Sequence, residues 1–192
     1  QAQSPANRKF DGPEDRPLAE RCIIWPNLGP PMLPSFYNNN FQIVQGPGYV
    51  AILSEMIHDV RMIPTDGRPH LPDHLRLWQG DSIGRWEGDT LVIETTNLNG
   101  KTWLNEVGEI VSHAERVVER LTPIDVDTIH YEATVSDPLV YTRPFTIGFL
   151  IKRMMNGELM EQACLEEDRD LPILKRIRDQ ERARLGIGPK GK

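Results

Sequence analysis

The stretch GRWEGDTLVI, residues 84–93, decides the fold class of this chain. Gly88-Asp89 supplies the positive φ that a two-residue type I′ or II′ loop needs. β-branched and aromatic residues, which favour strands, lie on both sides of that pair. The stretch therefore predicts a β-hairpin, two adjacent antiparallel strands joined by a tight turn.

Similar short runs, separated by turn residues, continue from Phe41 to Cys164. In the clearest of them Tyr131, Ala133 and Val135 share one face of a strand, which predicts one buried and one wet face. About nine strands are predicted, near residues 41–45, 49–56, 58–63, 82–87, 90–96, 113–121, 127–136, 144–152 and 158–165. Successive strands without helical crossovers predict a mainly β fold, an antiparallel meander that forms a lipocalin-like barrel or half-barrel.

Two segments of different composition flank the predicted β domain of residues 41–168. Residues 1–40 contain seven prolines, which predicts an extended arm in place of regular structure. Residues 169–192 predict a short helix and a basic tail, with eight Lys/Arg against three Asp/Glu. This segment carries +5 of the total of −6, so residues 1–168 carry −11. A basic tail on an acidic body predicts docking, either on its own domain or on an acidic neighbour. The expected docking residues are Trp25, Phe36, Tyr37, Lys175, Arg176, Arg178, Arg182 and Arg184.

Composition excludes several classes of protein. The 192 residues are 39% hydrophobic, enough for one core. No run approaches the roughly 18 apolar residues of a membrane span, so no transmembrane segment is expected. A pI near 5.4 without a long basic tract argues against nucleic acid as a partner. No glycine-rich phosphate loop opens a helix, and no cofactor is predicted.

The first residues and the cysteines predict the compartment. Residues 1–6 are small and polar, as is typical just after a signal-peptidase cut. We therefore expect an exported protein, periplasmic or extracellular, including a peripheral position on the outer side of the inner membrane. Cys22 and Cys164 lack the Cys-x-x-Cys spacing of a redox or zinc site. A disulfide between them is the simplest interpretation, and two buried thiols are the alternative.

Four motifs resemble a large family of exported bacterial proteins: PPMLPSFYNNN (30–40), EMIHD (55–59), DGRPH (66–70) and GRWEGDTLV (84–92). The resemblance covers about residues 20–165 and implies export and a β-rich fold, but no reaction. Relatives often carry a longer N-terminal region. They also carry a Leu-His pair before the Val-x-Glu-Arg run, where this chain has Glu115-Arg116. A catalytic role of that histidine could not operate here.

A long loop and its titratable residues are the strongest sign of an active site. Prolines and a glycine interrupt the strand pattern over residues 64–80, and long loops carry function more often than packing. If the chain is an enzyme, its catalytic candidates are His58, Asp66, Arg68, His70 and Asp81. His70 with Asp66 would form a general acid–base pair. The alternative is a loop tied down by Arg-to-Asp bridges.

Metal binding is also weighed, and no metal site is predicted. The run EMIHD contains carboxylate and imidazole ligands. On one continuous strand, however, His58 would point to the face opposite Glu55 and Asp59, so the three side chains could meet only at a bend. A half-buried, hydrogen-bonded His58 is expected instead. His70 and His74 have a spacing that binds zinc on a helix, but the prolines of the loop argue against a helix. A combination of His70 and His74 with His58 or His113 stays open.

Three functions are compatible with these residues. We expect a non-catalytic, exported accessory subunit that docks through its two arms onto a larger, membrane-bound complex of the respiratory or photosynthetic type, on the periplasmic side. Its partners would be other protein subunits. One alternative is an exported small-molecule hydrolase or lyase that uses the 58–81 loop region. The other is a lipocalin-like carrier of an apolar ligand, lined by tryptophans that could equally form the core.

Overall fold

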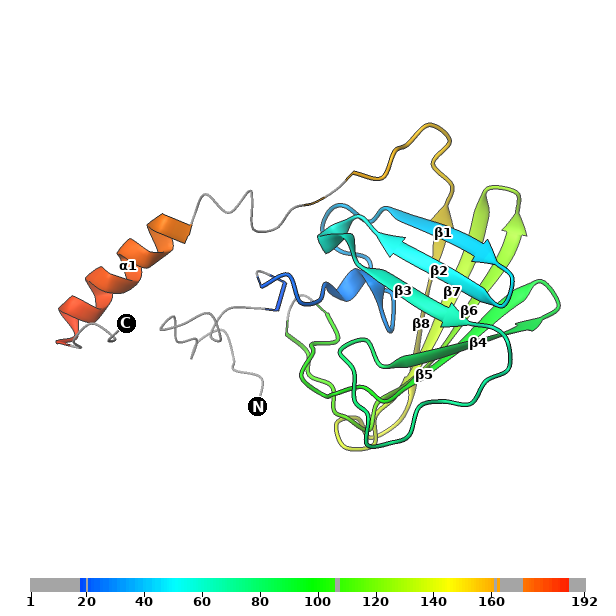
Figure 1. Cartoon of the computed structure of the whole chain (residues 1–192), viewed down its shortest axis with the longest axis horizontal. Coiled ribbons are helices and arrows are strands. Elements are labelled where there is room, and N and C mark those ends of the chain that lie inside the picture. The colour runs from blue at the N-terminus through cyan, green and yellow to red at the C-terminus, as the bar shows by residue number, and fades with distance from the viewer. Residues whose placement is uncertain (1–17, 20, 106–107, 161, 163–170, 187–192) are drawn as a thin grey trace.

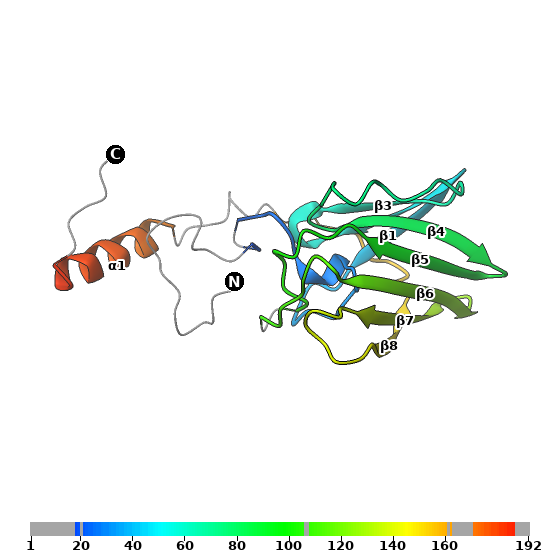
Figure 2. The same cartoon turned by 90° about the horizontal axis from the view of Figure 1, so that it is seen from below.

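The computed structural model of the chain describes residues 18–19, 21–105, 108–160, 162 and 171–186. Their strands form two antiparallel sheets that face each other as two layers (Figures 1 and 2). In chain order the elements are η3 (Pro26–Leu28), β1 (Phe41–Gly46), β2 (Tyr49–Ser54), η4 (Met56–His58), β3 (Val60–Pro64), β4 (Asp81–Glu87), β5 (Thr90–Thr96), β6 (Arg116–Asp125), β7 (Thr128–Ser136), β8 (Phe145–Lys152) and α1 (Leu171–Arg184).

The predicted meander is confirmed, and the closed barrel is not found. One sheet has the strand order β1-β2-β3 and the other has the order β4-β5-β6-β7-β8. The hairpin that decides the fold class is present: Glu87 pairs with Thr90, and Gly88 has a φ of 62°. The long loop between β3 and β4 interrupts the strand-to-strand pairing there. The described strands therefore form an open two-sheet arrangement, and the lipocalin-like barrel is not confirmed.

Several strand boundaries differ from those predicted, most of all in β6, which begins at Arg116 and ends at Asp125 where 113–121 is predicted. The second and third strands are separated by the short η4 turn, where Ile57 and His58 have positive φ values of 51° and 44°. A ninth strand was expected at residues 158–165, but residues 158–160 and 162 are not in a strand, and the rest of that range lies outside the described residues. Charged and turn residues at 153–158 end the alternation that β8 requires.

The core lies between the two sheets. Tyr131, Ala133 and Val135 of β7 are buried there, as their alternation predicts. Ile93 of β5 and Val117 of β6 lie beside them in the five-stranded sheet, and Val50, Ile52 and Ile63 face this layer from the three-stranded sheet. Each strand contributes one apolar face, which is why a chain of modest hydrophobic content closes a single core.

The N-terminal arm is partly a component of this core. Leu28, at the end of η3, and Met32 are buried among the core side chains, and the Met32 N–H donates a hydrogen bond to the Tyr131 Oη at 2.8 Å. The expected anchor Trp25 is half-buried and donates to Ser35 Oγ at 3.3 Å. Phe36, in contrast, is 83% exposed. The arm thus inserts at residues 28–32 and lies open to solvent a few residues later.

The predicted C-terminal helix is confirmed as α1, which lies apart from the two sheets (Figures 1 and 2). Lys175 and Arg176 are exposed on it, whereas Arg178 pairs with Asp179 and Arg184 pairs with Glu181. Within the described part of the chain, no helix has the length and apolar character to cross a membrane. Cys164 lies outside the described residues, so its disulfide with Cys22 stays a prediction.

Candidate functional site

A buried ion pair connects the two sheets. Arg61 of β3 is 2% exposed and Glu119 of β6 is fully buried. The Arg61 Nη1 donates to Glu119 Oε1 at 2.9 Å, and its Nη2 donates to Glu119 Oε2. Burial opposes the charge of Arg61, but the charge and hydrogen bonds of Glu119 together outweigh it and leave the Arg61 pKa above its ordinary value. Arg61 therefore keeps its charge in the interior.

Three more side chains complete this interior network. Arg61 also donates to Ser82 Oγ at 3.0 Å and to Thr95 Oγ1 at 2.8 Å. The Tyr131 hydroxyl donates to Glu119 Oε1 at 2.7 Å. Burial, followed by the Glu119 charge, raises the pKa of Tyr131 well above its ordinary value, so its hydroxyl keeps its proton. Four hydrogen bonds from Arg61 go to protein acceptors, which makes this network a structural connection of the two sheets.

The sequence interpretation missed this network, although a signal was present. Val117, Glu119 and Leu121 alternate along β6, so a carboxylate falls on the buried face of the strand. Arg61 likewise lies among apolar residues of β3. A charged residue at an inward position of each of two strands predicts a buried pair only once the two sheets are known to face each other.

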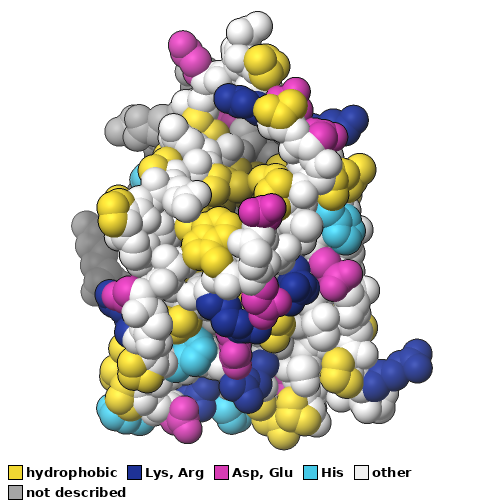
Figure 3. Space-filling model, turned by 90° about the vertical axis from the view of Figure 1, so that its right-hand side faces the viewer, with side chains coloured by type: hydrophobic (Ala, Val, Ile, Leu, Met, Phe, Trp, Pro, Cys, Tyr) yellow, Lys and Arg dark blue, Asp and Glu magenta, His cyan; other side chains and the backbone are white. Residues whose placement is uncertain are grey.

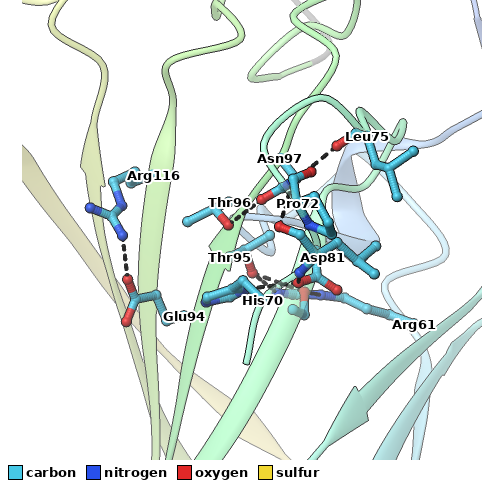
Figure 4. Close-up of polar contacts among 12 residues, drawn as sticks. Arg61, His70, Pro72, Leu75, Asp81, Glu94, Thr95, Thr96, Asn97 and Arg116 are labelled. Carbon is cyan, nitrogen blue, oxygen red and sulfur yellow. Dashed lines mark hydrogen bonds and ion pairs between the residues drawn. The ribbon is translucent and has the colours of Figure 1, made fainter. Parts of the chain in front are cut away.

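The predicted catalytic candidates His70 and Asp81 do lie together. His70 Nδ1 is 2.8 Å from Asp81 Oδ2, and the Leu71 N–H donates to the same oxygen at 2.9 Å (Figure 4). The two side chains are 27% and 15% exposed. Asp81 is the first residue of β4 and His70 lies in the loop that precedes it, so the carboxylate orients an imidazole at the edge of the five-stranded sheet.

The expected pair of His70 with Asp66 is not formed. Asp66 instead accepts hydrogen bonds from Arg68, with 2.6 Å between Oδ2 and Nη2, on the exposed surface. The hydrogen bond from Arg68 is the main reason that the Asp66 pKa falls to about 2. Asp66 is paired with Arg68, and its low pKa makes the carboxylate a weak base, so it does not serve His70 as an acid–base partner.

The loop that carries His70 is held by one buried side chain. Asn97 Nδ2 lies 3.2, 3.0 and 3.0 Å from the carbonyl oxygens of Leu71, Pro72 and Leu75 (Figure 4). Asn97 also adopts a φ of 59°, a conformation that asparagine tolerates better than most residues. The Asn97 carbonyl accepts from the Leu77 N–H at 2.9 Å. The loop is therefore fixed against the end of β5.

The remaining metal candidates have separate partners. Glu55 is buried and accepts from Asn40 Nδ2 at 2.5 Å, while Asp59 accepts from Gln79. His58 is exposed, contrary to the half-buried position expected, because the η4 turn directs it outward to the Gln162 carbonyl, 3.2 Å from Nδ1. In the described ranges no three or more His, Cys, Asp or Glu side chains are placed to hold a metal, and this includes His74 and His113.

A second acidic group, which the sequence interpretation missed, lies beside β6. Glu115 is 2% exposed, and its Oε1 has no hydrogen-bond partner within the described residues. Burial, and then the charge of Asp137, raises the Glu115 pKa to about 8. Asp137 accepts from the Ser112 N–H and Oγ at 2.6 and 2.7 Å. Glu115 is thus neutral at pH 7 while Asp137 is satisfied by its own donors.

The outer face of the three-stranded sheet is almost entirely apolar. Val50, Ile52 and Ile63 point into the core, so their neighbours along each strand point outward. Val44, Ala51 and Met62 lie opposite one another across the sheet. We call the outward set the apolar face: Val44, Tyr49, Ala51, Leu53, Val60, Met62 and Pro64.

The apolar face is exposed and carries no charge. Val44, Tyr49, Val60 and Met62 are 38–54% exposed, and Gln42 is the one polar side chain at an outward position of these strands. The Tyr49 ring covers Gly46, where a Cβ atom would lie 2.4 Å from the ring. By contrast, histidine, acidic and basic side chains gather at the lower end of the surface shown in Figure 3.

Comparisons of the chain with protein-family models, with curated proteins and with solved structures give no match. The candidate sites therefore rest on the geometry of the chain itself.

Proposed function

We propose that the chain is a non-catalytic accessory subunit that docks onto a larger protein assembly. The apolar face carries this proposal. A contiguous exposed apolar surface is costly in water and usually marks an interaction site. The centres of protein interfaces are depleted of charged residues and enriched in Tyr and Met, and the apolar face contains Tyr49 and Met62 without a charged residue.

Two further regions support docking. Phe36 and Tyr37 expose aromatic rings at the surface end of the arm, and rings of this kind are frequent anchors of interfaces. Lys175 and Arg176 are exposed on α1 and would steer the chain toward an acidic neighbour. The setting proposed is the one expected from the sequence: export, and a membrane-bound complex of the respiratory or photosynthetic type on the periplasmic side.

The test is size-exclusion chromatography with mass analysis, after mild detergent extraction of the protein from its native membranes at native expression level. We expect co-migration with a large assembly. Met62→Glu places a charge in the apolar face and should release the protein from that assembly. Leu150→Glu adds the same charge on exposed β8, outside the apolar face, and should leave the complex intact. Elution of the wild-type chain near 22 kDa would contradict the proposal.

The His70–Asp81 pair supports a second function, an exported hydrolase or lyase. The Asp81 carboxylate accepts the Nδ1–H of His70 and so leaves Nε2 as the basic nitrogen of the imidazole. A substrate screen tests this function directly. Any turnover found should be lost in both His70→Gln and Asp81→Asn and kept in His74→Gln, an exposed histidine of the same loop.

A carrier function has the least support. A lipocalin-like carrier needs an open interior for its apolar ligand. Here Arg61, Glu119 and Tyr131 occupy the space between the sheets together with the core side chains. A polar, hydrogen-bonded centre also suits an apolar ligand poorly.

A further inference from the structure

The free edge of β1 presents backbone groups in an order that the hairpin determines. The two-residue turn Pro47-Gly48 makes Gly46 and Tyr49 the closing hydrogen-bonded pair of β1 and β2. Hydrogen-bonded pairs alternate along an antiparallel ladder, so the even-numbered residues of β1 bond to β2. The N–H and C=O groups of Phe41, Ile43 and Gln45 therefore point away from β2. The Ser54 N–H, which donates to Asp59 on the β3 side at 2.9 Å, agrees with this alternation.

Within the described residues these edge groups are unused. β1 is the terminal strand of its sheet, and no hydrogen bond there involves the backbone of Phe41, Ile43 or Gln45 beyond the sheet itself. Ile43 and Val44 are both exposed, although their side chains point to opposite faces. A row of unpaired donors and acceptors on an exposed strand is a template for another strand.

β1 also lacks the features that normally protect an edge. Natural edge strands carry charges, especially lysine, or a proline or a bulge that prevents pairing. β1 reads FQIVQG, with no charged residue and no proline, and its register against β2 is unbroken. The other three edge strands of the two sheets differ: β3 contains Arg61 and Pro64, β4 contains Asp81, Arg85 and Glu87, and β8 contains Gly148 and ends in Lys152. Among the described edge strands, β1 is therefore the one with neither a charge nor a proline.

We propose that β1 pairs antiparallel with β1 of a second copy of this chain, so that a symmetric dimer contains one continuous six-stranded sheet. An uncharged strand offers nothing that would select a partner of opposite charge, whereas an identical strand matches it residue for residue. When Ile43 lies opposite Ile43 of the second copy, Phe41 of each copy lies opposite Gln45 of the other copy. The edge-facing N–H and C=O groups of Phe41, Ile43 and Gln45 then pair between the two copies and form about six hydrogen bonds in total.

The two-fold symmetry of this pairing limits the assembly to two copies and doubles the area of the apolar face. A two-fold axis perpendicular to the sheet closes the assembly at two copies, because each β1 edge is used once. Because this axis is perpendicular to the sheet, the side chains of the apolar face lie on the same side of the sheet in both copies. Two apolar faces then lie side by side on one sheet, although the dimer itself does not depend on any further partner.

Sedimentation equilibrium of the full chain over a range of concentrations tests the dimer. We expect the mass to rise from 21.9 kDa to twice that value. Ile43→Lys and Ile43→Glu each place like charges opposite one another and should weaken association at least tenfold, while an equimolar mixture of the two variants should restore it. Leu150→Lys, the matched charge on the β8 edge, should leave the dimer unchanged.

Two measurements keep the test decisive if the charge variants fold poorly, which circular dichroism reports. Gln45→Pro removes one edge-facing N–H while its side chain position is exposed, and it should also weaken the dimer. In the wild-type chain the amides of Ile43 and Gln45 should exchange with solvent more slowly as concentration rises. A wild-type chain that stays at 21.9 kDa, or a dimer that Ile43→Lys and Gln45→Pro both leave intact, would overturn the inference.

Discussion

Arg61 and Glu119 form an ion pair whose partners come from different sheets and are both shielded from water. They lie 58 residues apart in the chain. A buried pair of this kind is easily broken by the loss of one partner, because the other charge is then left without compensation.

Glu119→Leu should therefore destabilise the protein by about 3 to 5 kcal/mol. The double variant Arg61→Met with Glu119→Leu should recover most of that loss, since two apolar side chains can replace the pair. Urea unfolding of the three proteins measures the difference. Equal stability of the single and double variants would contradict the assignment of the penalty to an unpaired Arg61.

Tyr131→Phe tests the attachment of the arm. The change removes the hydroxyl that donates to Glu119 and accepts from the Met32 N–H, so the unfolding free energy should fall by about 1 to 3 kcal/mol. Hydrogen exchange of the Met32 amide should accelerate more than that of amides in β5. If the Met32 amide stays as protected as in the wild-type chain, the hydroxyl does not hold the arm.

Glu115 gives a prediction about pH. Its pKa is raised from an ordinary value of 4.5 to about 8 in the folded chain, so the folded state binds more protons than the unfolded state between those values. Stability should fall as pH rises through this window, with the full loss present above pH 8.

Glu115→Gln removes this titration. The variant should gain stability over the wild-type chain by roughly 2 kcal/mol or more at pH 8.5, and the gain should shrink toward pH 5. Thermal unfolding at the two pH values measures it. A gain that does not depend on pH would show that Glu115 titrates normally.

The loop that carries His70 should loosen when Asn97 is replaced. Asn97→Gly keeps the backbone conformation of φ 59° but removes the side-chain hydrogen bonds, and it should cost about 1 to 3 kcal/mol. Asn97→Ala should cost roughly 1 kcal/mol more, because alanine is strained at that φ. Limited proteolysis within residues 65–80 should be faster in both variants. Unchanged cleavage would mean that other contacts hold the loop.

Local signals predicted the local structure well. The Gly88-Asp89 turn and the terminal helix were predicted because each depends on a few neighbouring residues. His70 and Asp81 were predicted as one cluster, with Asp66 and Arg68, because His70 lies in the long loop and Asp81 directly follows it. Asp66, however, pairs with Arg68 only two residues away, which is the Arg-to-Asp bridge given as the alternative for this loop.

The long-range features escaped prediction for a different reason. Met32 lies in an irregular, proline-rich segment without periodicity, a setting that predicts an anchor on the folded surface and does not predict a core residue. The apolar face was missed because β2 and β3 carry apolar residues on both faces, a pattern that does not say which face is open.

The insertion of Met32 sets an order for chain synthesis. Residues 28–32 leave the ribosome or a translocation channel long before Tyr131, their hydrogen-bond partner 99 residues later. Leu28 and Met32 have no native site until most of the five-stranded sheet has emerged and paired. A nascent chain therefore carries two exposed core residues until β7 has been made, and the arm becomes fixed among the last parts of the domain.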